Sequence, residues 1–248
     1  MPDYHKMLYN IEVHSVEGIR QYFQEGGNPN EVHDGMPLFK TMVEMYLRSP
    51  RFKQCIKIFI DFGLEFDDKP LLAVLADDPE KLEKFIIDDP DLIDKKYSGF
   101  NNTFTPLKES TLLHYCAEYN HVECAKILVR HGANVNASAG IDENGFGGHT
   151  PIFHTVCQNL NNSEQMLHFL LDQHADLENS VKGLVWGKGY EWETFIPAVN
   201  PISYAMMGLL PQMHRDPLIV SKVISLLIKR AYGIDYTPPN VPNAYLSH

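Results

Sequence analysis

The stretch from Thr111 to Asn136, TLLHYCAEYNHVECAKILVRHGANVN, constrains the fold of this chain more than any other segment. It predicts two short amphipathic helices. In its first half Leu113, Cys116 and Ala117 share one face at helical spacing. The second half carries a wider apolar stripe of Val122, Ala125, Ile127, Leu128 and Val129. We expect the second helix to end at Gly132, because glycine readily adopts the left-handed backbone that terminates helices.

Two helices of this length cannot bury their own apolar faces. Isolated helices below about 12 to 15 residues are marginal in water. Copies of the unit must therefore stack, and weaker copies do recur along the chain, each with a turn residue after its second helix. Those turn residues are Gly26, Gly63, Pro90, Gly132, His174 and a residue near position 232.

The central unit resembles the ankyrin repeat, which has a period of about 33 residues and a T-P-L-H-x-A motif. Thr111, Leu113 and His114 occupy the first, third and fourth places of that motif, while Leu112 replaces the proline and Cys116 the alanine. The segment HVECAKILVRHGANVN resembles the second ankyrin helix and its exit turn. This resemblance implies an all-α solenoid of stacked helix-turn-helix units with extended hairpin loops.

The repeats predict a single ankyrin-repeat domain over residues 1–236. The six predicted repeats cover residues 5–35, 36–68, 69–97, 111–144, 150–180 and 200–236. The third is short, and Pro90 stands where its turn glycine should be. Residues 237–248 read as a proline-rich C-terminal tail.

The repeats are further apart than an ideal array allows, so the connections between them are enlarged. The excess lies in residues 97–110, 137–149 and 179–199. Insertions in repeat proteins lengthen the loops on one face, which is often the binding face. We therefore expect these three connections to carry the function.

The connection at 181–199 holds both tryptophans of the chain, Trp186 and Trp192, with Tyr190 and Phe195 among glycines. Aromatic residues on a glycine-punctuated hairpin are typical of a recognition surface, because they bury much area at low entropic cost. The alternative is that the rings fold back and cover the edge of the fifth repeat. Residues 186–215, with the sequence WGKGYEWE, also resemble a segment of a bacterial subgroup of ankyrin-repeat proteins, which supplies no activity.

The connection at 137–149 pairs Asp142 and Glu143 with Phe146 among four glycines. The register of a calcium-binding loop is absent, so a flexible loop is the preferred interpretation. Together with the aromatic segment it predicts an acidic and aromatic recess on the concave side of the solenoid.

The charge balance argues against a nucleic-acid partner. The chain has 21 Lys and Arg against 32 Asp and Glu, a net charge of -11, whereas nucleic-acid binding needs a basic surface. The N-terminus lacks the pattern of a secretory signal, and no apolar run approaches the roughly 18 residues of a membrane span. We expect a cytoplasmic protein with no membrane partner and with buried, reduced cysteines.

No motif indicates an enzyme, a metal or a cofactor. The chain lacks a nucleophile elbow, a phosphate-binding loop and a dinucleotide-binding glycine motif. Its 12 histidines include no HExxH pair and no paired Cys/His spacing. The resemblance implies that His114 forms a hydrogen bond near the repeat turn. Glu191 and Glu193 flank Trp192, and we interpret them as solvated carboxylates.

The sequence thus predicts a protein-interaction scaffold that binds another protein through its concave helix face and its enlarged loops. The assignment rests on analogy with the family, because a fold alone does not fix a function. Two alternatives stay open. One is a small-molecule or metal-dependent activity beneath the 181–199 loop, and the other is an inhibitory role that masks a toxic partner.

Overall fold

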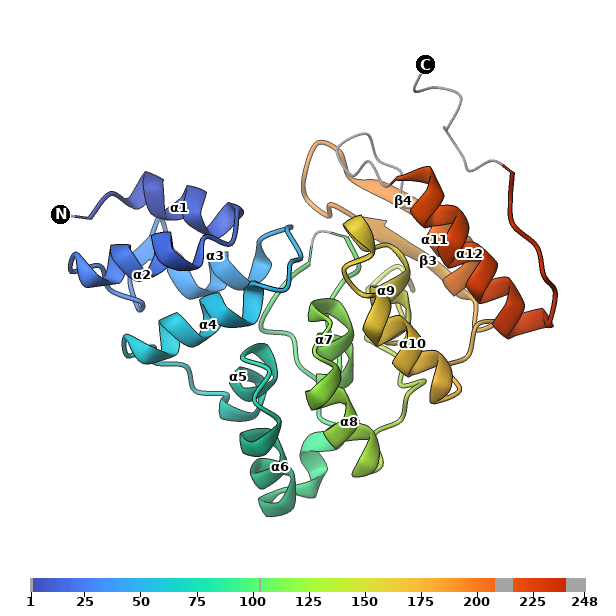
Figure 1. Cartoon of the computed structure of the whole chain (residues 1–248), viewed down its shortest axis with the longest axis horizontal. Helices are drawn as coiled ribbons and strands as arrows, with labels where there is room; N and C mark the ends of the chain where they lie inside the picture. The colour runs from blue at the N-terminus through green and yellow to red at the C-terminus, as the bar shows by residue number, and fades with distance from the viewer. Residues whose placement is uncertain (1, 103, 208–215, 240–248) are drawn as a thin grey trace.

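The computed structural model describes residues 2–102, 104–207 and 216–239, so most of the predicted tail at 237–248 lies outside the described residues. Within them the chain forms consecutive pairs of helices (Figure 1). The first helices of the pairs are α1 (Tyr4–Glu12), α3 (Leu38–Glu44), α5 (Lys69–Leu75), α7 (Leu112–Tyr119), α9 (Phe153–Val156) and α11 (Pro201–Met207). The second helices are α2 (Val16–Gln24), α4 (Phe52–Asp61), α6 (Pro79–Asp88), α8 (Val122–Arg130), α10 (Glu164–Asp172) and α12 (Pro217–Tyr232).

The helices begin and end where short-range signals place them. Asp3, Ser15, Asp68 and Asp78 cap the helices that follow them, each through a side-chain oxygen that accepts a backbone N–H. The turn glycines after α2, α4 and α8 have φ of 98°, 90° and 97°, in the left-handed region. His174 takes the same role after α10 with φ 62°.

The repeats stack so that first helices pack on first helices and second helices on second helices. The pairs α5–α7, α7–α9 and α9–α11 form one layer, while α2–α4, α6–α8 and α8–α10 form the other. Leu128 on α8 is completely buried in the apolar core that runs along this stack. Stacking is therefore what stabilises helices too short to be stable alone.

Asparagines at the exit turns link successive repeats. The Asn30 side chain donates to the carbonyl of Gly63 at 2.9 Å and accepts the N–H of Glu65 at 2.8 Å. Asn136 accepts the N–H of Asp176 at 2.8 Å and donates to the carbonyl of His174. Each amide thus satisfies turn groups of the next repeat that would otherwise have no intrahelical partner.

His114 forms the hydrogen bonds that the family resemblance implies. Its Nδ1 accepts the backbone N–H of Thr111, and its Nε2 lies 3.2 Å from the carbonyl oxygen of His149 at the entrance of the next repeat. Since Nδ1 is the acceptor, Nε2 is the nitrogen that donates. The imidazole therefore ties two adjacent repeats together.

The second repeat also contacts the fourth, across a buried ion pair. Arg48, in the connection between α3 and α4, donates through Nε to Glu118 on α7 at 2.6 Å. The second carboxylate oxygen of Glu118 lies 2.6 Å from Nδ1 of His154 on α9. Next to the pair, the rings of Phe52 and Tyr119 stack at 4.1 Å. In Figure 1 the third repeat, α5 and α6, lies below α4 of the second repeat.

The prediction of an all-α fold is only partly correct, because the chain also forms two small antiparallel sheets. One pairs β1 (Val32–His33) with β2 (Met36–Pro37), and the other pairs β3 (Val181–Trp186) with β4 (Thr194–Val199). The glycines of the 181–199 segment weaken helix formation, while a paired hairpin satisfies its backbone groups in a ladder. The predicted extended loop is therefore an ordered β-hairpin.

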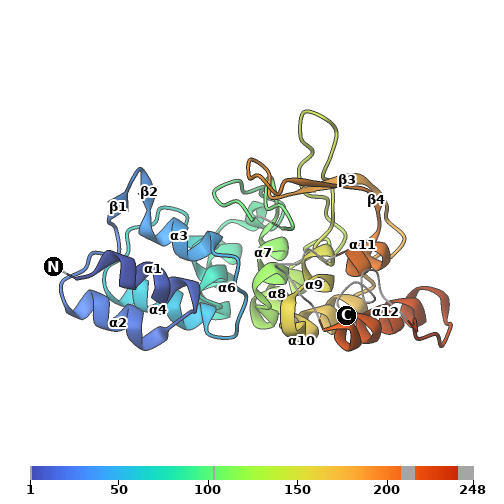
Figure 2. The ribbon, with the colours of Figure 1, turned by 90° about the horizontal axis from the view of Figure 1, so that it is seen from above.

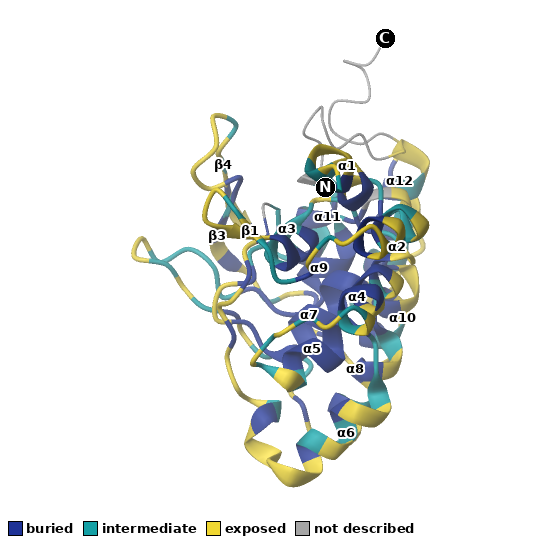
Figure 3. Ribbon diagram, turned by 90° about the vertical axis from the view of Figure 1, so that its left-hand side faces the viewer, coloured by how far each residue is buried: buried dark blue, intermediate teal, exposed yellow. Residues whose placement is uncertain are grey.

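The enlarged connections lie on one side of the helices. Figure 2 shows β1–β2, the 97–110 connection, the 137–149 loop and the β3–β4 hairpin above the helical layers. Their outer ends are largely exposed (Figure 3). Within the described ranges, no helix has the length and apolar character to cross a lipid bilayer.

Candidate binding surface

Trp186 anchors the β3–β4 hairpin to the last repeat. Its indole is 1% exposed, and its Nε1 donates to the hydroxyl of Tyr204 on α11 at 2.6 Å. That hydroxyl lies 3.0 Å from Oγ1 of Thr105, in the 97–110 connection. The Trp186 ring is therefore buried against the sixth repeat and the 97–110 connection and does not face solvent.

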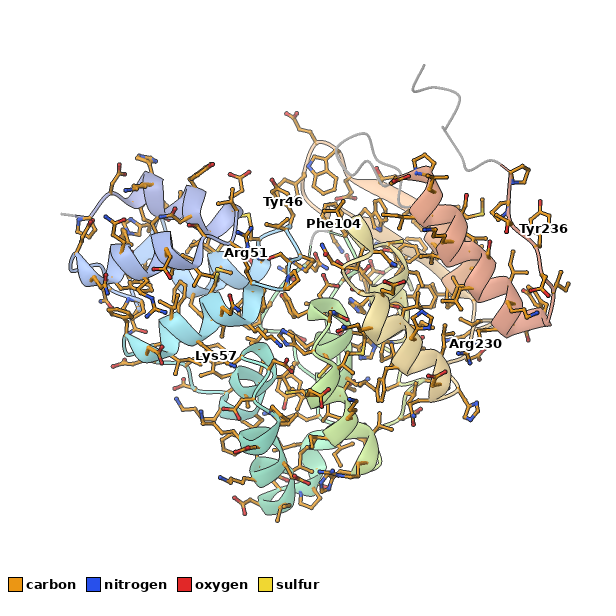
Figure 4. All side chains as sticks on the ribbon, viewed as in Figure 1. Tyr46, Arg51, Lys57, Phe104, Arg230 and Tyr236 are labelled. Carbon is orange, nitrogen blue, oxygen red and sulfur yellow. The ribbon has the colours of Figure 1, made fainter. Side chains whose placement is uncertain are left out.

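Trp192 and Tyr190 lie at the hairpin tip. Gly187 has φ 60°, and a Cβ there would lie 2.3 Å from the Trp192 ring, so the tip requires glycine at this position. Tyr190 stacks on Trp192 with ring centroids 5.3 Å apart and is 56% exposed. The ring of Phe104, which is labelled in Figure 4, has its centroid 5.9 Å from that of Trp192. The tip thus exposes Tyr190, which stacks on Trp192, and Trp192 in turn packs against Phe104.

Phe195 and Phe146 join the hairpin to the 137–149 loop. Their ring centroids are 4.5 Å apart, and Phe195 is 47% exposed. The Phe195 ring lies over Gly183, where a Cβ would approach it to 2.3 Å. Contact with Gly183 and Phe146 holds the Phe195 ring in place while much of it still faces solvent.

Asp142 and Glu143 bind the hairpin through Lys188. The Lys188 ammonium lies 3.1 Å from Glu143 and 3.6 Å from Asp142. Asp142 also accepts the backbone N–H groups of Phe146 and Asn144, and these hydrogen bonds together with Lys188 lower the pKa of its carboxyl. Lys188 of the hairpin therefore neutralises part of the negative charge of the 137–149 loop.

A backbone hydrogen bond completes the connection between loop and hairpin. The N–H of Gly147 donates to the carbonyl of Gly183 at 3.0 Å. Loop and hairpin thus form one surface, which we call the hairpin surface. It consists of Asp142, Glu143, Phe146, Lys188, Tyr190, Trp192 and Phe195.

A groove runs between the hairpin surface and α3. Its cavity volume is about 420 Å³, and it is lined by Lys40 on α3, by Lys108 and by Asp142, Val185 and Tyr190. This volume is within the range of about 300 to 1,000 Å³ typical of ligand sites. Three of the predicted site residues, Asp142, Phe146 and Tyr190, line this groove.

A much smaller cavity lies near Phe104, between the second and fifth repeats. It has a volume of about 70 Å³ and is lined by Arg48, Glu118, His154 and neighbouring residues. Its size allows a few water molecules but not a metabolite. Among the residues that the structure describes, no group of three or more His, Cys, Asp or Glu side chains is arranged to hold a metal ion.

Sequence reasoning missed Lys188 and Phe104. Lys188 stands between the two tryptophans and opposite an acidic loop, so charge complementarity between the two insertions was an available signal. Phe104 lies in the 97–110 connection, which was identified only as an insertion. Its contacts with Trp186 and Trp192 join residues 82 and 88 positions apart, and no local pattern encodes such contacts.

Stacked helix pairs with finger-like connections on one side define a helical-repeat solenoid. A family profile for ankyrin repeats in three copies matches residues 54–180, about half of the chain. The chain therefore belongs to the ankyrin-repeat family, whose members generally mediate protein–protein interactions and are typically not enzymes. A search of curated proteins finds no match.

Proposed function

We propose that this chain binds another protein through the hairpin surface and the adjoining concave face of the first helices. The observation that carries the proposal is the exposure of Tyr190 and Phe195 on a hairpin that Trp186, the last residue of β3 before the tip, fixes to the repeats. Large aromatic rings held in place lose little entropy on binding, and such residues are enriched among the strongest contributors to interfaces.

Apolar residues on the neighbouring fingers support the same surface. Val32 and Met36 on the β1–β2 finger and Ile141 on the 137–149 loop are exposed, like Tyr190 and Phe195 on the hairpin. Figure 2 places these fingers on one side of the molecule. Exposed apolar groups that gather on one side are characteristic of a protein-interaction site.

The test is quantitative affinity capture with the double variant Tyr190→Ala/Phe195→Ala. Its control is Tyr9→Ala/Tyr232→Ala, which removes two equally exposed aromatic rings from α1 and α12. We expect the hairpin variant to capture at least tenfold less partner than the wild type, and the control to capture as much as the wild type. Full capture by the hairpin variant would show that the partner binds elsewhere.

A further inference from the structure

The outer edge of β3 has a free backbone position at Val185. In an antiparallel ladder, residue pairs that exchange hydrogen bonds alternate with pairs that do not. Gly183 lies opposite Pro197, which has no N–H, so this pair belongs to the second kind. Val185 follows Gly183 by two residues along β3, so the pair that it forms with Phe195 also exchanges no hydrogen bonds. The N–H and C=O of Gly183 and Val185 therefore point away from β4.

The outer side of Gly183 already has a backbone partner in the protein. Gly147 donates its N–H to the carbonyl of Gly183, as a third strand would. No backbone partner meets Val185 from the outer side within the parts of the chain that the structure describes. A free backbone donor and acceptor at a sheet edge is a template for another strand.

Val185 opens into the groove beneath the hairpin surface, and the charged side chains of this groove indicate what it could bind. Three lysines line it, and two of them are paired: Lys40 lies 3.6 Å from Glu44, and Lys188 contacts Asp142. Lys108 has no carboxylate partner among the described residues. An incoming carboxylate would therefore complement Lys108.

We propose that this groove binds an extended segment of a partner protein, which adds to the outer edge of β3 and places a carboxylate at Lys108. The residue opposite Val185 would exchange two backbone hydrogen bonds with it. In such strand addition the main chain supplies affinity and the side chains supply specificity. This inference rests on the proposed function and specifies the chemistry of the partner.

The apolar side chains of the groove determine which partner residues it accepts besides the carboxylate. Phe146 and Tyr190 line the groove together with Val185, and both rings belong to the hairpin surface. Side chains alternate in direction along a strand. The segment recognised by the groove is therefore one in which an acidic residue alternates with an apolar residue.

The test uses a random library of 12-residue peptides displayed on phage and selected on the full chain, followed by synthesis of the enriched peptide. We expect enrichment of an acidic residue next to apolar residues in alternation. N-methylation of the peptide backbone should abolish binding only at the residue that lies opposite Val185, because Gly183 is already paired with Gly147. Exchange of the Val185 amide proton, followed by NMR, should slow when the peptide is bound.

Point variants assign the peptide to the groove. Lys108→Ala should weaken peptide binding about tenfold. The control Lys126→Ala removes an exposed lysine that pairs with Glu123 on α8, outside the groove, and should leave the dissociation constant unchanged. Equal binding by the wild type and Lys108→Ala would overturn the assignment of the carboxylate.

Other outcomes separate this inference from the proposed function. If Tyr190→Ala/Phe195→Ala abolishes peptide binding while every N-methylated peptide still binds, strand addition is overturned and the hairpin surface stands. A selection that enriches no peptide also overturns strand addition, while the capture experiment decides the proposed function by itself. If a chain ending at Pro239 shows faster Val185 exchange than the full chain, the C-terminal residues occupy the edge, and the inference is overturned.

Discussion

Glu118 is a buried carboxylate that contacts both the guanidinium of Arg48 and the imidazole of His154. Burial alone would raise its pKa, but the charge of Arg48 and the hydrogen bond from His154 lower the pKa below its ordinary value. The stability that the ionised carboxylate contributes is therefore complete above about pH 4.5 and is lost as the pH falls below it.

Glu118→Gln should destabilise the fold by about 3 to 5 kcal/mol, because it leaves the Arg48 guanidinium buried without its counter-charge. The matched control is Glu123→Gln, which breaks the exposed pair with Lys126 and should cost less than about 1 kcal/mol. Urea denaturation gives both free energies of unfolding. Equal losses for the two variants would show that the buried pair contributes no more than an exposed one.

Two buried histidines make the fold sensitive to mild acid. Burial lowers the pKa of His149 to about 3, with help from His154, and that of His14 to about 4, with help from Arg48 and Arg51. In the unfolded chain both titrate near 6.5. Between the pKa values of the folded and the unfolded chain, the folded state binds fewer protons than the unfolded state. The free energy of unfolding should therefore fall as the pH drops from about 6.5 to 4.

The expected slope is about 1.4 kcal/mol per pH unit for each histidine. Urea midpoints measured at pH 7.5 and pH 5 test it, and NMR titration of the two imidazoles in the folded protein assigns it. Unchanged midpoints, or imidazole pKa values near 6.5 in the folded protein, would contradict the burial of neutral rings.

Among the elements, the β3–β4 hairpin carries two tryptophans in unlike environments. Trp186 is buried and donates to Tyr204, whereas Trp192 is partly buried at the tip. Trp192→Phe leaves Trp186 as the sole fluorophore, and Trp186→Phe leaves Trp192. We expect Trp186 to emit at shorter wavelength and to resist quenching by acrylamide, while Trp192 is quenched readily.

The same two variants measure how much the contact between Trp186 and Tyr204 stabilises the fold. Trp186→Phe removes the hydrogen bond to Tyr204 and should cost about 1 to 3 kcal/mol, because a buried hydroxyl loses its donor. Trp192→Phe keeps an aromatic ring on which Tyr190 can stack, so it should lower the free energy of unfolding by less than Trp186→Phe does. Equal quenching of both single-tryptophan proteins would contradict the hairpin register that we describe.

Sequence reasoning predicted the elements whose causes are local. Leu113 on α7 and Leu128 on α8 each belong to an apolar stripe at helical spacing, and Gly132 follows α8 with φ 97°, so the pattern along the chain was sufficient. It could not assign Trp186 to the core and Trp192 to the tip, because strand register decides which face a side chain takes. Nor could it pair Arg48 with Glu118, which lie 70 residues apart.

At the scale of the whole molecule, stability depends on the stacking of neighbouring repeats. Leu128→Asp places a carboxylate in the fully buried core of the central repeat and should unfold at least the repeats around it. The cost is the lost burial of leucine, about 1.5 to 3 kcal/mol, plus several kcal/mol for an unpaired buried charge.

The matched control is Ile87→Asp, an equivalent change at an exposed position on α6. Circular dichroism during thermal unfolding should show a large loss of helix at 25 °C for Leu128→Asp and a melting curve close to wild type for Ile87→Asp. Similar curves for both variants would mean that the repeats do not depend on a continuous core.

The central claim is that the fingers on one side of the solenoid form the partner-binding surface. Hydrogen–deuterium exchange of the chain with its captured partner tests it most directly. We predict protection at residues 98–108, 137–149 and 181–199, with little change in the second helices of the repeats. Protection confined to the second helices, with unchanged exchange in the β3–β4 hairpin, would contradict the claim.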